Sequence, residues 1–398
     1  MLLLPVLVAV AVCWMPFISS VVGEVTLLED DAGALHINTS DPMSQPVFVN
    51  GVNVHDTLSM LMSTVSAQQS TIDRVYGKVC TPSARTFGKL ETSGNKWIGG
   101  VLANNGLIYA VPFFASSVLI IDPSSNTVDT TTIAEFARGG GKWAGAALSH
   151  NGLIYMFPSN TQAILTIDPV TNTVDTTTLD DLPPSRNKWY SGLAANNGLI
   201  FGIPLYSTSV LIVDAMTNTT DITTLSGLSS EGNKWYGGVQ ADNGFIYCIP
   251  LRETSVLIIN PVSLTMDLTT LFGLDSGAVW HGAVLANNGL IYTFPGFTKK
   301  ALVIDPASNT ISPLVVASPT SSVKWLGGVL APNGNIIGIP FGSPNVFIFD
   351  PTTNTTDTTS IGGLAGTQKW YDGVLAPNGL IYGIPDFADT VLVIDPGC

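Results

Sequence analysis

Residues 187–232 read NKWYSGLAANNGLIFGIPLYSTSVLIVDAMTNTTDITTLSGLSSEG, and the same pattern begins again at Asn233. Its tryptophan recurs at intervals of 46, 46, 46, 45, 45 and 45 residues, at Trp97, Trp143, Trp189, Trp235, Trp280, Trp325 and Trp370. A fixed period of about 20–50 residues is typical of repeat arrays, in which each unit buries its faces against its neighbours. Seven copies of one unit therefore decide the architecture.

Each repeat is predicted to contain four short strands. In the fourth repeat the first strand, residues 234–241, begins with Lys-Trp and ends before an Asn-Gly pair that is present in all seven copies. The second strand, 245–250, ends in Pro, and the third, 256–260, is nearly continuous in apolar residues, as in a strand buried on both faces. A turn rich in Thr and Asn leads to the fourth strand. Four antiparallel strands per unit without a helical period predict an all-β, seven-bladed β-propeller.

One phrase of the repeat resembles known propeller families. The stretch VLIIDPSSNTVDTTTI, residues 118–133, resembles the YVTN and NHL repeats of extracellular and periplasmic propellers. The Trp and Asn-Gly punctuation is similar to that of kelch repeats. The resemblance covers all seven units and implies the fold. It implies no single function, because propellers include binding proteins, lyases, lactonases and scaffolds.

The ends of the chain are predicted to close the ring. Repeat seven stops at Cys398, just after its third strand, and residues 82–87 (PSARTF) fall where a fourth strand would precede the first repeat. We expect this segment to be the outer strand of the last blade. Cys80 and Cys398 occupy successive positions of the same turn, so we expect a disulfide between them, which requires an oxidising compartment. The alternative is two unrelated free thiols.

The start of the chain and its composition favour export. Residues 1–23 are uncharged and mostly apolar and resemble a secretory signal peptide, with an uncleaved anchor as the alternative. The net charge of −14 argues against a nucleic-acid partner, which would need basic patches. We therefore expect a secreted or cell-surface protein. N-glycosylation sequons stand at Asn38, Asn218 and Asn354.

Residues 24–79 do not repeat and are predicted to form a stem before the propeller, residues 80–398. Residues 47–51 are typical of a short strand and turn. Apolar or seam positions then alternate by four and three residues, at Val54, Leu58, Leu61, Val65, Gln68, Ile72, Val75 and Val79. This spacing predicts a helix with a coiled-coil seam that gathers two or three copies of the chain. The alternative is an amphipathic helix packed on its own propeller.

The two faces of the predicted propeller differ. The Asn-Gly and Asp-Pro turns of one face are nearly identical in all repeats, as turn geometry alone would require. The loops between second and third strands on the other face vary, which is the usual layout of a binding surface on a rigid scaffold. The candidate ligand-binding residues, which begin the first strand beside these loops, are Lys96, Lys142, Lys188, Tyr190, Lys234, Tyr236, His281, Lys324, Lys369 and Tyr371.

These residues have two interpretations. As a cationic and aromatic ring round the channel mouth, they suit an anionic ligand or a sugar. Alternatively, each tryptophan fills the gap between blades and each lysine extends over it into water. We favour the second interpretation for both the tryptophans and the lysines.

Catalytic signatures are few. The chain has no GxSxG, HExxH or CxxC motif, and its four histidines are scattered. Asp275, Glu231, Glu253, Asp372, Asp386 and Asp389 are the acidic residues expected near the variable loops. We expect no catalytic residues, no metal and no cofactor. A binding module with an extracellular protein, glycan or small-molecule ligand is favoured. A lactonase- or lyase-like enzyme at the channel mouth and a structural matrix component are the alternatives.

Overall fold

A computed structural model describes residues 25–29, 35–39, 47–49, 52–275, 277, 279–296, 300–315 and 323–398. The chain divides into two compact units, Met1–Lys78 and Val79–Cys398, which are described separately. The predicted signal peptide, residues 1–23, lies outside the described residues.

The described residues of the first unit form two short antiparallel strand pairs and one helix. Strand β1 (Val25–Glu29) pairs with β2 (Leu35–Thr39), and β3 (Phe48–Val49) pairs with β4 (Val52–Asn53). The Asn53 side chain then caps helix α1 (Val54–Val79), because its Oδ1 accepts hydrogen bonds from the amides of His55 and Asp56 at 3.1 and 3.3 Å. The sequence predicted the helix over these residues.

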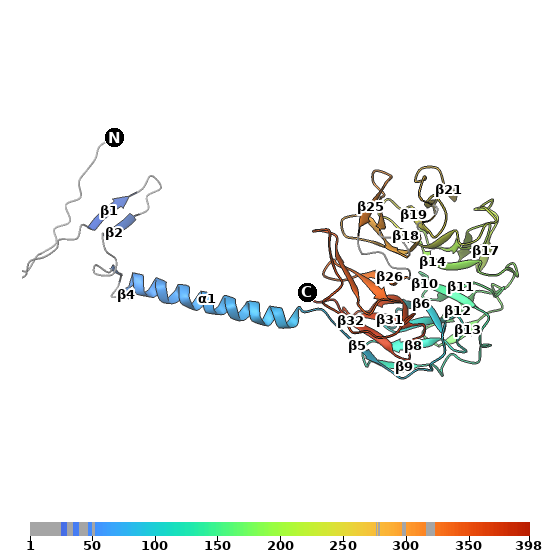
Figure 1. The fold of residues 1–398 in the computed structure, drawn as a ribbon, viewed down its shortest axis with the longest axis horizontal. Helices are drawn as coiled ribbons and strands as arrows, with labels where there is room; N and C mark the ends of the chain where they lie inside the picture. Colours follow the sequence, from blue (N-terminus) through green and yellow to red (C-terminus); the bar gives the residue numbers. More distant parts are fainter. Residues whose placement is uncertain are drawn as a thin grey trace, which may run out of the picture. The chain divides into compact units, whose positions relative to one another are not determined.

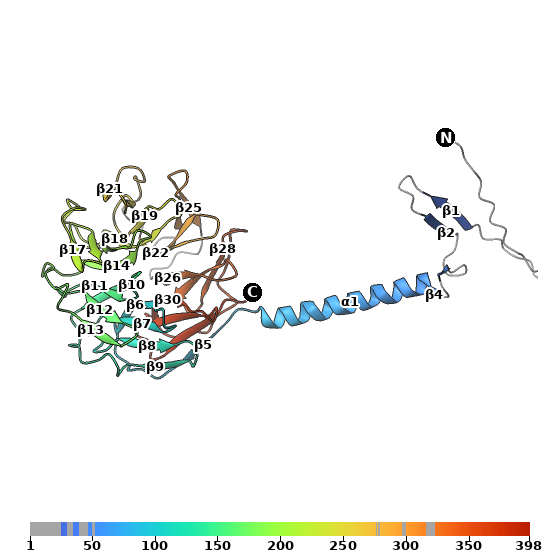
Figure 2. The same ribbon diagram turned by 180° about the vertical axis from the view of Figure 1, so that it is seen from behind.

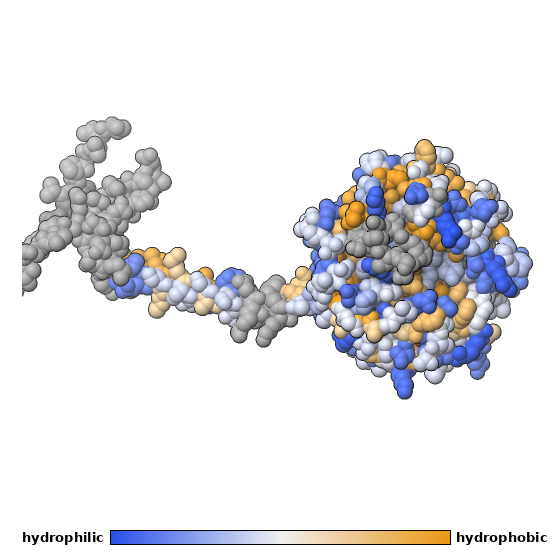
Figure 3. Space-filling view, viewed as in Figure 1, coloured by the Kyte–Doolittle hydropathy of each residue, from blue (hydrophilic) through white to orange (hydrophobic). Residues whose placement is uncertain are grey.

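Four seam positions of α1 are more than half exposed within this unit. They are Leu58, Leu61, Val65 and Ile72, and hydrophobic residues are visible along the coloured part of the helix in Figure 3. The described part of the chain contains no helix that is long and apolar enough to cross a membrane. The coiled coil stays a prediction.

The second unit is a seven-bladed β-propeller of four-stranded antiparallel blades, as predicted (Figures 1 and 2). The innermost strands are β6 (Trp97–Leu102), β10 (Trp143–Leu148), β14 (Trp189–Ala194), β18 (Trp235–Gln240), β22 (Trp280–Leu285), β26 (Trp325–Leu330) and β30 (Trp370–Leu375). The second strands are β7 (Ile108–Pro112), β11 (Ile154–Pro158), β15 (Leu199–Pro204), β19 (Ile246–Pro250), β23 (Ile291–Pro295), β27 (Ile336–Pro340) and β31 (Ile381–Pro385). Neighbouring innermost strands contact one another round the axis.

The outer half of each blade is more variable in length. The third strands are β8 (Leu119–Asp122), β12 (Leu165–Asp168), β16 (Leu211–Asp214), β20 (Leu257–Asn260), β24 (Lys300–Asp305), β28 (Phe347–Asp350) and β32 (Val391–Asp395). The fourth strands are β9 (Thr127–Asp129), β13 (Thr173–Asp175), β17 (Thr219–Asp221), β21 (Thr265–Asp267), β25 (Thr310–Val315), β29 (Thr355–Asp357) and β5 (Ser83–Phe87).

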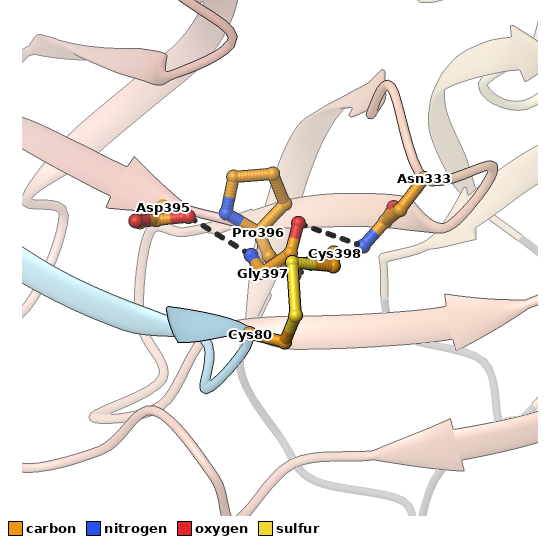
Figure 4. Close-up of a disulfide and its surroundings, with 6 residues drawn as sticks. All are labelled: Cys80, Asn333, Asp395, Pro396, Gly397 and Cys398. Carbon is orange, nitrogen blue, oxygen red and sulfur yellow. Dashed lines mark hydrogen bonds between the residues drawn. A yellow bond between two sulfur atoms is a disulfide. The ribbon is translucent and has the colours of Figure 1, made fainter. Parts of the chain in front are cut away.

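The ring closes as predicted, because β5 completes the last blade. It pairs antiparallel with β32, from Val391 opposite Phe87 to Asp395 opposite Ser83. Cys80 and Cys398 form a disulfide beside this pair, with their Cα atoms 4.6 Å apart (Figure 4). Gly397 makes the approach possible, because its φ is +77° and a Cβ there would collide with the Cys80 carbonyl oxygen.

The core consists of separate layers between neighbouring blades. Every tryptophan of the repeat is at most 5% exposed, and each indole Nε1 donates to a backbone carbonyl twenty residues ahead, as Trp97 does to Ser117 at 2.8 Å. The other acceptors are the carbonyl oxygens of Ala163, Ser209, Ser255, Lys300, Asn345 and Thr390. The tryptophans are therefore core residues, as we favoured.

The Asn-Gly turns do more than reverse the chain. In the first repeat Gly106 has a φ of +81° whereas the φ of Asn105 is negative, and the Gly106 amide donates to the Ala103 carbonyl at 3.0 Å. This is a type I turn followed by a left-handed glycine. The Asn105 Nδ2 also donates to the Pro169 carbonyl of the next blade at 2.8 Å. The expectation that this face serves turn geometry alone was wrong, because its asparagines also join neighbouring blades.

Candidate functional site

The predicted lysine ring is placed differently from both interpretations. Five of its members are at most 7% exposed, namely Lys96, Lys142, Lys188, Lys234 and Lys369. The ammonium of Lys188 donates to the carbonyls of Ser159 and Thr161 in the preceding blade, at 3.1 and 2.7 Å, and to that of Ser185 at 2.9 Å. These lysines do not extend into water. The ammonium groups of Lys96, Lys142, Lys188 and Lys369 join neighbouring blades, and that of Lys234 donates to the Glu231 carbonyl.

The charge of these buried lysines is held by backbone oxygens. Burial lowers the pKa of Lys142, Lys188 and Lys369 to about 8. Three carbonyl oxygens accept hydrogen bonds from each of these ammonium groups, which favours the charged form. Lys324 is half-buried, and its Nζ lies 5.5 Å from the ring centre of Trp325.

The predicted aromatic residues do meet, and they fill the loop end of the axis. Tyr236 lies 5.6 Å from Tyr190, 5.0 Å from His281 and 6.5 Å from Tyr371 between ring centres. Phe113 packs on Tyr190 at 5.6 Å. Each of the four predicted residues follows the tryptophan of its strand, so the cluster lies at the loop end of the innermost strands. We call Tyr190, Tyr236, His281 and Tyr371 the axial cluster.

The axial cluster holds buried polar atoms without partners. Among the described residues, the buried side-chain atoms with no hydrogen-bond partner are Ser159 Oγ, Tyr236 OH, both ring nitrogens of His281 and Asp386 Oδ1. Burial raises the pKa of Tyr236 and lowers that of His281 to about 4, so the imidazole is neutral at physiological pH. An unpartnered buried polar group costs about 1–3 kcal/mol, so this part of the molecule is not optimised for stability.

A cavity of about 220 Å³ lies on the axis beneath the axial cluster. All seven innermost strands line it, mostly with glycine at the second position after the tryptophan, such as Gly99 and Gly237. Two strands differ at that position, where they carry Ser191 and Asp372. The cavity therefore has a largely uncharged wall with a single carboxylate in it.

Two carboxyl groups of the last blade lie at the axis. Asp372 borders the cavity, and its Oδ1 accepts a hydrogen bond from the Gly373 amide at 2.8 Å. Asp386 is 1% exposed beside the axial cluster. Burial raises the pKa of Asp372 to about 6 and that of Asp386 to about 7, although the nearby Lys96 charge lowers the latter.

The variable loops carry a second candidate site that the predicted residues did not include. Phe114, Tyr206 and Phe387 occupy equivalent loop positions and are 38%, 39% and 39% exposed. The Tyr206 ring lies against Gly232, where a Cβ would collide with it. In the sequence, each of these aromatic residues lies two positions after the proline that ends the second strand. The residue between the proline and the aromatic ring is buried, so the side chain that follows it faces outward.

Tyr206 borders a groove of about 490 Å³ on the loop face. Ser229, Glu231, Arg252 and Glu253 also line the groove, and they supply hydroxyl, carboxylate and guanidinium groups around one aromatic ring. Phe387 borders a second groove of about 400 Å³ on the same face. Figure 3 shows one side of the propeller, where hydrophobic residues are interspersed with hydrophilic ones. The loop face can thus offer stacking and hydrogen bonding together.

The remaining predicted site residues are placed as follows. Asn218 and Asn354 are exposed in the turns between third and fourth strands, with φ of 52° and 55°. Asn38 lies in β2, and its side chain is outside the described residues. Cys248 is a buried free thiol. Throughout the described ranges, no group of three or more His, Cys, Asp or Glu side chains could hold a metal ion.

No family model matches this chain, and no curated protein matches it. Solved propellers resemble it in structure. A streptogramin B lyase matches with a TM-score of 0.64 and 13% identity over 79% of this chain and 97% of that one. A catalytically inactive variant of virginiamycin B lyase from Staphylococcus aureus, solved with quinupristin, matches with a TM-score of 0.63 and 10% identity over 79% and 99%.

A third similar structure is an extracellular domain. It belongs to a putative one-component system from B. thetaiotaomicron and matches with a TM-score of 0.57 and 10% identity, over 78% of this chain and 40% of that one. At these identities the likeness shows the propeller fold alone.

Proposed function

We propose that this chain is a secreted or cell-surface binding module that holds a carbohydrate-like ligand on its loop face. The observation that carries the proposal is Tyr206, which is 39% exposed, rests on Gly232 and borders a groove lined by Arg252, Glu231 and Glu253. An aromatic ring fixed by a backbone behind it loses little freedom when a flat apolar sugar face stacks on it. The surrounding charged and hydroxyl groups then hydrogen-bond the hydroxyls of the ligand.

The scaffold suits such a role. Ammonium and asparagine groups join neighbouring blades, as Lys188 and Asn197 do through hydrogen bonds to backbone carbonyls, and each indole is fixed within its own blade, as Trp189 is by the Ser209 carbonyl. A loop on a scaffold of this kind can change in sequence while its anchoring strands stay fixed. The variation of these loops beside seven nearly constant turns supports binding on the loop face.

Export is part of the proposal. The Cys80–Cys398 disulfide is consistent with an oxidising compartment. The signal-like residues 1–23 and the exposed sequons at Asn218 and Asn354 support secretion or surface display. Peptide mapping of protein expressed in a secretory host, before and after glycosidase treatment, tests cleavage and glycosylation together.

A glycan array probed with residues 24–398 tests the binding function. We expect saturable binding to a defined set of sugars, lost by at least about tenfold in Tyr206→Ala. Met216→Ala is the matched control, because Met216 is 83% exposed in a turn of the opposite face. Binding to no sugar, or equal binding by Tyr206→Ala and wild type, would contradict the proposal.

A lyase-like role at the channel mouth is the alternative, and the observation that favours it is the Asp372 carboxyl group at the axial cavity. The axial carboxyl group of Asp372 would then be the candidate proton-transfer group, since its pKa is about 6. Turnover of quinupristin by wild type, and its loss in Asp372→Asn, would favour this alternative. Sugar binding without any turnover would favour the binding module.

A further inference from the structure

The positions where the repeat departs from its own pattern gather at the axis. The second residue after the tryptophan is glycine in five blades, Ser191 in the third and Asp372 in the seventh. The first residue after the tryptophan is aromatic at Tyr190, Tyr236 and Tyr371. Since a sevenfold repeat needs none of these for closure, their presence round one cavity indicates a site.

The Asp372 carboxylate lies beside the glycines of neighbouring innermost strands, which have no side chain there. A Cβ at Gly327 would collide with Oδ1, and a Cβ at Gly99 would lie 3.9 Å from Oδ2. Among the described groups, the Gly373 amide favours its charged form, and burial opposes it more strongly. Asp372 is half-buried, and a cation bound beside it would offset the cost of burying its charge.

The five buried lysines do not supply that cation. The ammonium groups of Lys96, Lys142, Lys188, Lys234 and Lys369 donate to backbone carbonyls. Three tyrosines meanwhile bound the loop end of the cavity, and Tyr236 is close enough to Asp372 for the carboxylate charge to raise its pKa. The cavity thus combines one carboxylate with several aromatic rings.

We propose that the axial cavity binds a small organic ammonium ion, with Asp372 as its counter-charge and Tyr190, Tyr236 and Tyr371 as its aromatic wall. Aromatic rings attract a cation to their faces, and quaternary ammonium groups are the ligands most often bound in this way. Calcium usually takes six to eight oxygen ligands, several of them carboxylate oxygens, whereas the side chains of the described lining offer one carboxylate and the Ser191 hydroxyl besides the tyrosines.

The volume also fits. A cavity of about 220 Å³ has room for a choline-sized ion and excludes a polymer. Tyr190, Tyr236 and Tyr371 border the loop end of this cavity. This site is separate from the loop-face groove at Tyr206, and the two inferences can fail independently.

Isothermal titration calorimetry with choline chloride tests the proposal on residues 24–398. Its neutral isostere 3,3-dimethylbutan-1-ol has the same shape without the charge and serves as the ligand control. We expect one saturable site for choline at about pH 8 and binding at least about tenfold weaker for the alcohol. Affinity for choline should also fall by about tenfold towards pH 5, because Asp372 becomes protonated there.

Two variants complete the test. Asp372→Asn removes the charge at constant shape and should weaken choline binding by at least about tenfold. Asp389→Asn removes a charge from an exposed position of the same blade and should leave binding unchanged. Equal affinity of choline and the alcohol, an unchanged affinity in Asp372→Asn, or no choline binding in the wild type would each overturn the proposal. If Asp372→Asn does not fold, the pair of ligands and the pH dependence decide it on the wild-type protein.

Discussion

Removing the disulfide should lower the melting temperature of the propeller without changing its fold. Cys80 and Cys398 are 318 residues apart in sequence, so the bond restricts nearly the whole chain of the propeller when it unfolds. The chain-entropy relation for a loop of that length gives about 6 kcal/mol at 25 °C, and measured disulfides usually contribute about 2–4 kcal/mol. For a domain of this size, about 2–6 kcal/mol corresponds to a shift of about 3–9 °C.

The assay is differential scanning calorimetry of residues 24–398 and of the double variant Cys80→Ser, Cys398→Ser. The variant should keep the wild-type circular dichroism spectrum, because five residue pairs still join β5 to β32. Reductant should lower the melting temperature of the wild type and leave the variant unchanged, since the other free thiol, Cys248, is buried. Equal melting temperatures for the wild type and the variant under oxidising conditions would refute the reasoning.

Three further predictions concern the axis, the lysines and the stem. In urea unfolding, Asp386→Asn should stabilise the protein by up to about 4 kcal/mol above pH 7 and have no effect below about pH 4. The reason is that the Asp386 pKa is about 7 in the folded protein and near 3.9 in the unfolded chain, so that ionisation destabilises the fold only at high pH. A gain that is greatest in acid would contradict this prediction. Lys188→Met should lower the unfolding free energy by about 1–3 kcal/mol, because the carbonyls of Thr161 and Ser185 lose the ammonium donor, while that of Ser159 keeps the Lys188 amide as a donor. The exposed control Lys89→Met should not lower it, and equal stability of the two variants would count against the interblade role. Deleting residues 24–78 should leave a folded monomer by light scattering, whereas the chain that retains α1 should be dimeric or trimeric; an unchanged state of association would exclude the coiled coil.

The fold could be predicted closely because the same strand and turn signals occur in each of the seven repeats. The tryptophan period, the Asn-Gly pairs and the strand-ending prolines are local signals, and seven copies remove the ambiguity of any one. The position of residues 82–87 just before the first repeat placed them as the outer strand of the last blade, where β5 lies, and the matching turn positions of Cys80 and Cys398 predicted their disulfide. The closure of the ring could be predicted because a fixed repeat length shows which strand is missing from the last blade.

The site was harder to predict because its partners come from other blades. The carbonyls that bind the Lys188 ammonium belong to Ser159 and Thr161 in the preceding blade, and no spacing within one repeat reveals them. The sequence placed Tyr190, Tyr236, His281 and Tyr371 on one rim. Whether such rings line an open channel or pack together depends on the directions of their side chains, and here Tyr236 contacts the other three rings.

The exposure of the loop side chains also depends on residues distant in the sequence. Leu205 and Tyr206 are adjacent, yet Leu205 is 5% exposed and Tyr206 is 39% exposed. The difference arises because Gly232, in the loop that leads to the next blade, leaves a flat backbone against which the Tyr206 ring rests. Sequence alone identified the variable loops, whereas the structure identifies which of their side chains faces outward.

Hydrogen-exchange mass spectrometry with a bound array sugar tests most directly whether the loop face is the binding surface. The account predicts added protection in peptides that contain residues 205–208, 229–233 and 252–254, which surround the Tyr206 groove. Peptides from the turns around Met216 and Val262 on the opposite face should exchange as in the free protein. Protection confined to those turns, or to the innermost strands, would contradict a loop-face binding module.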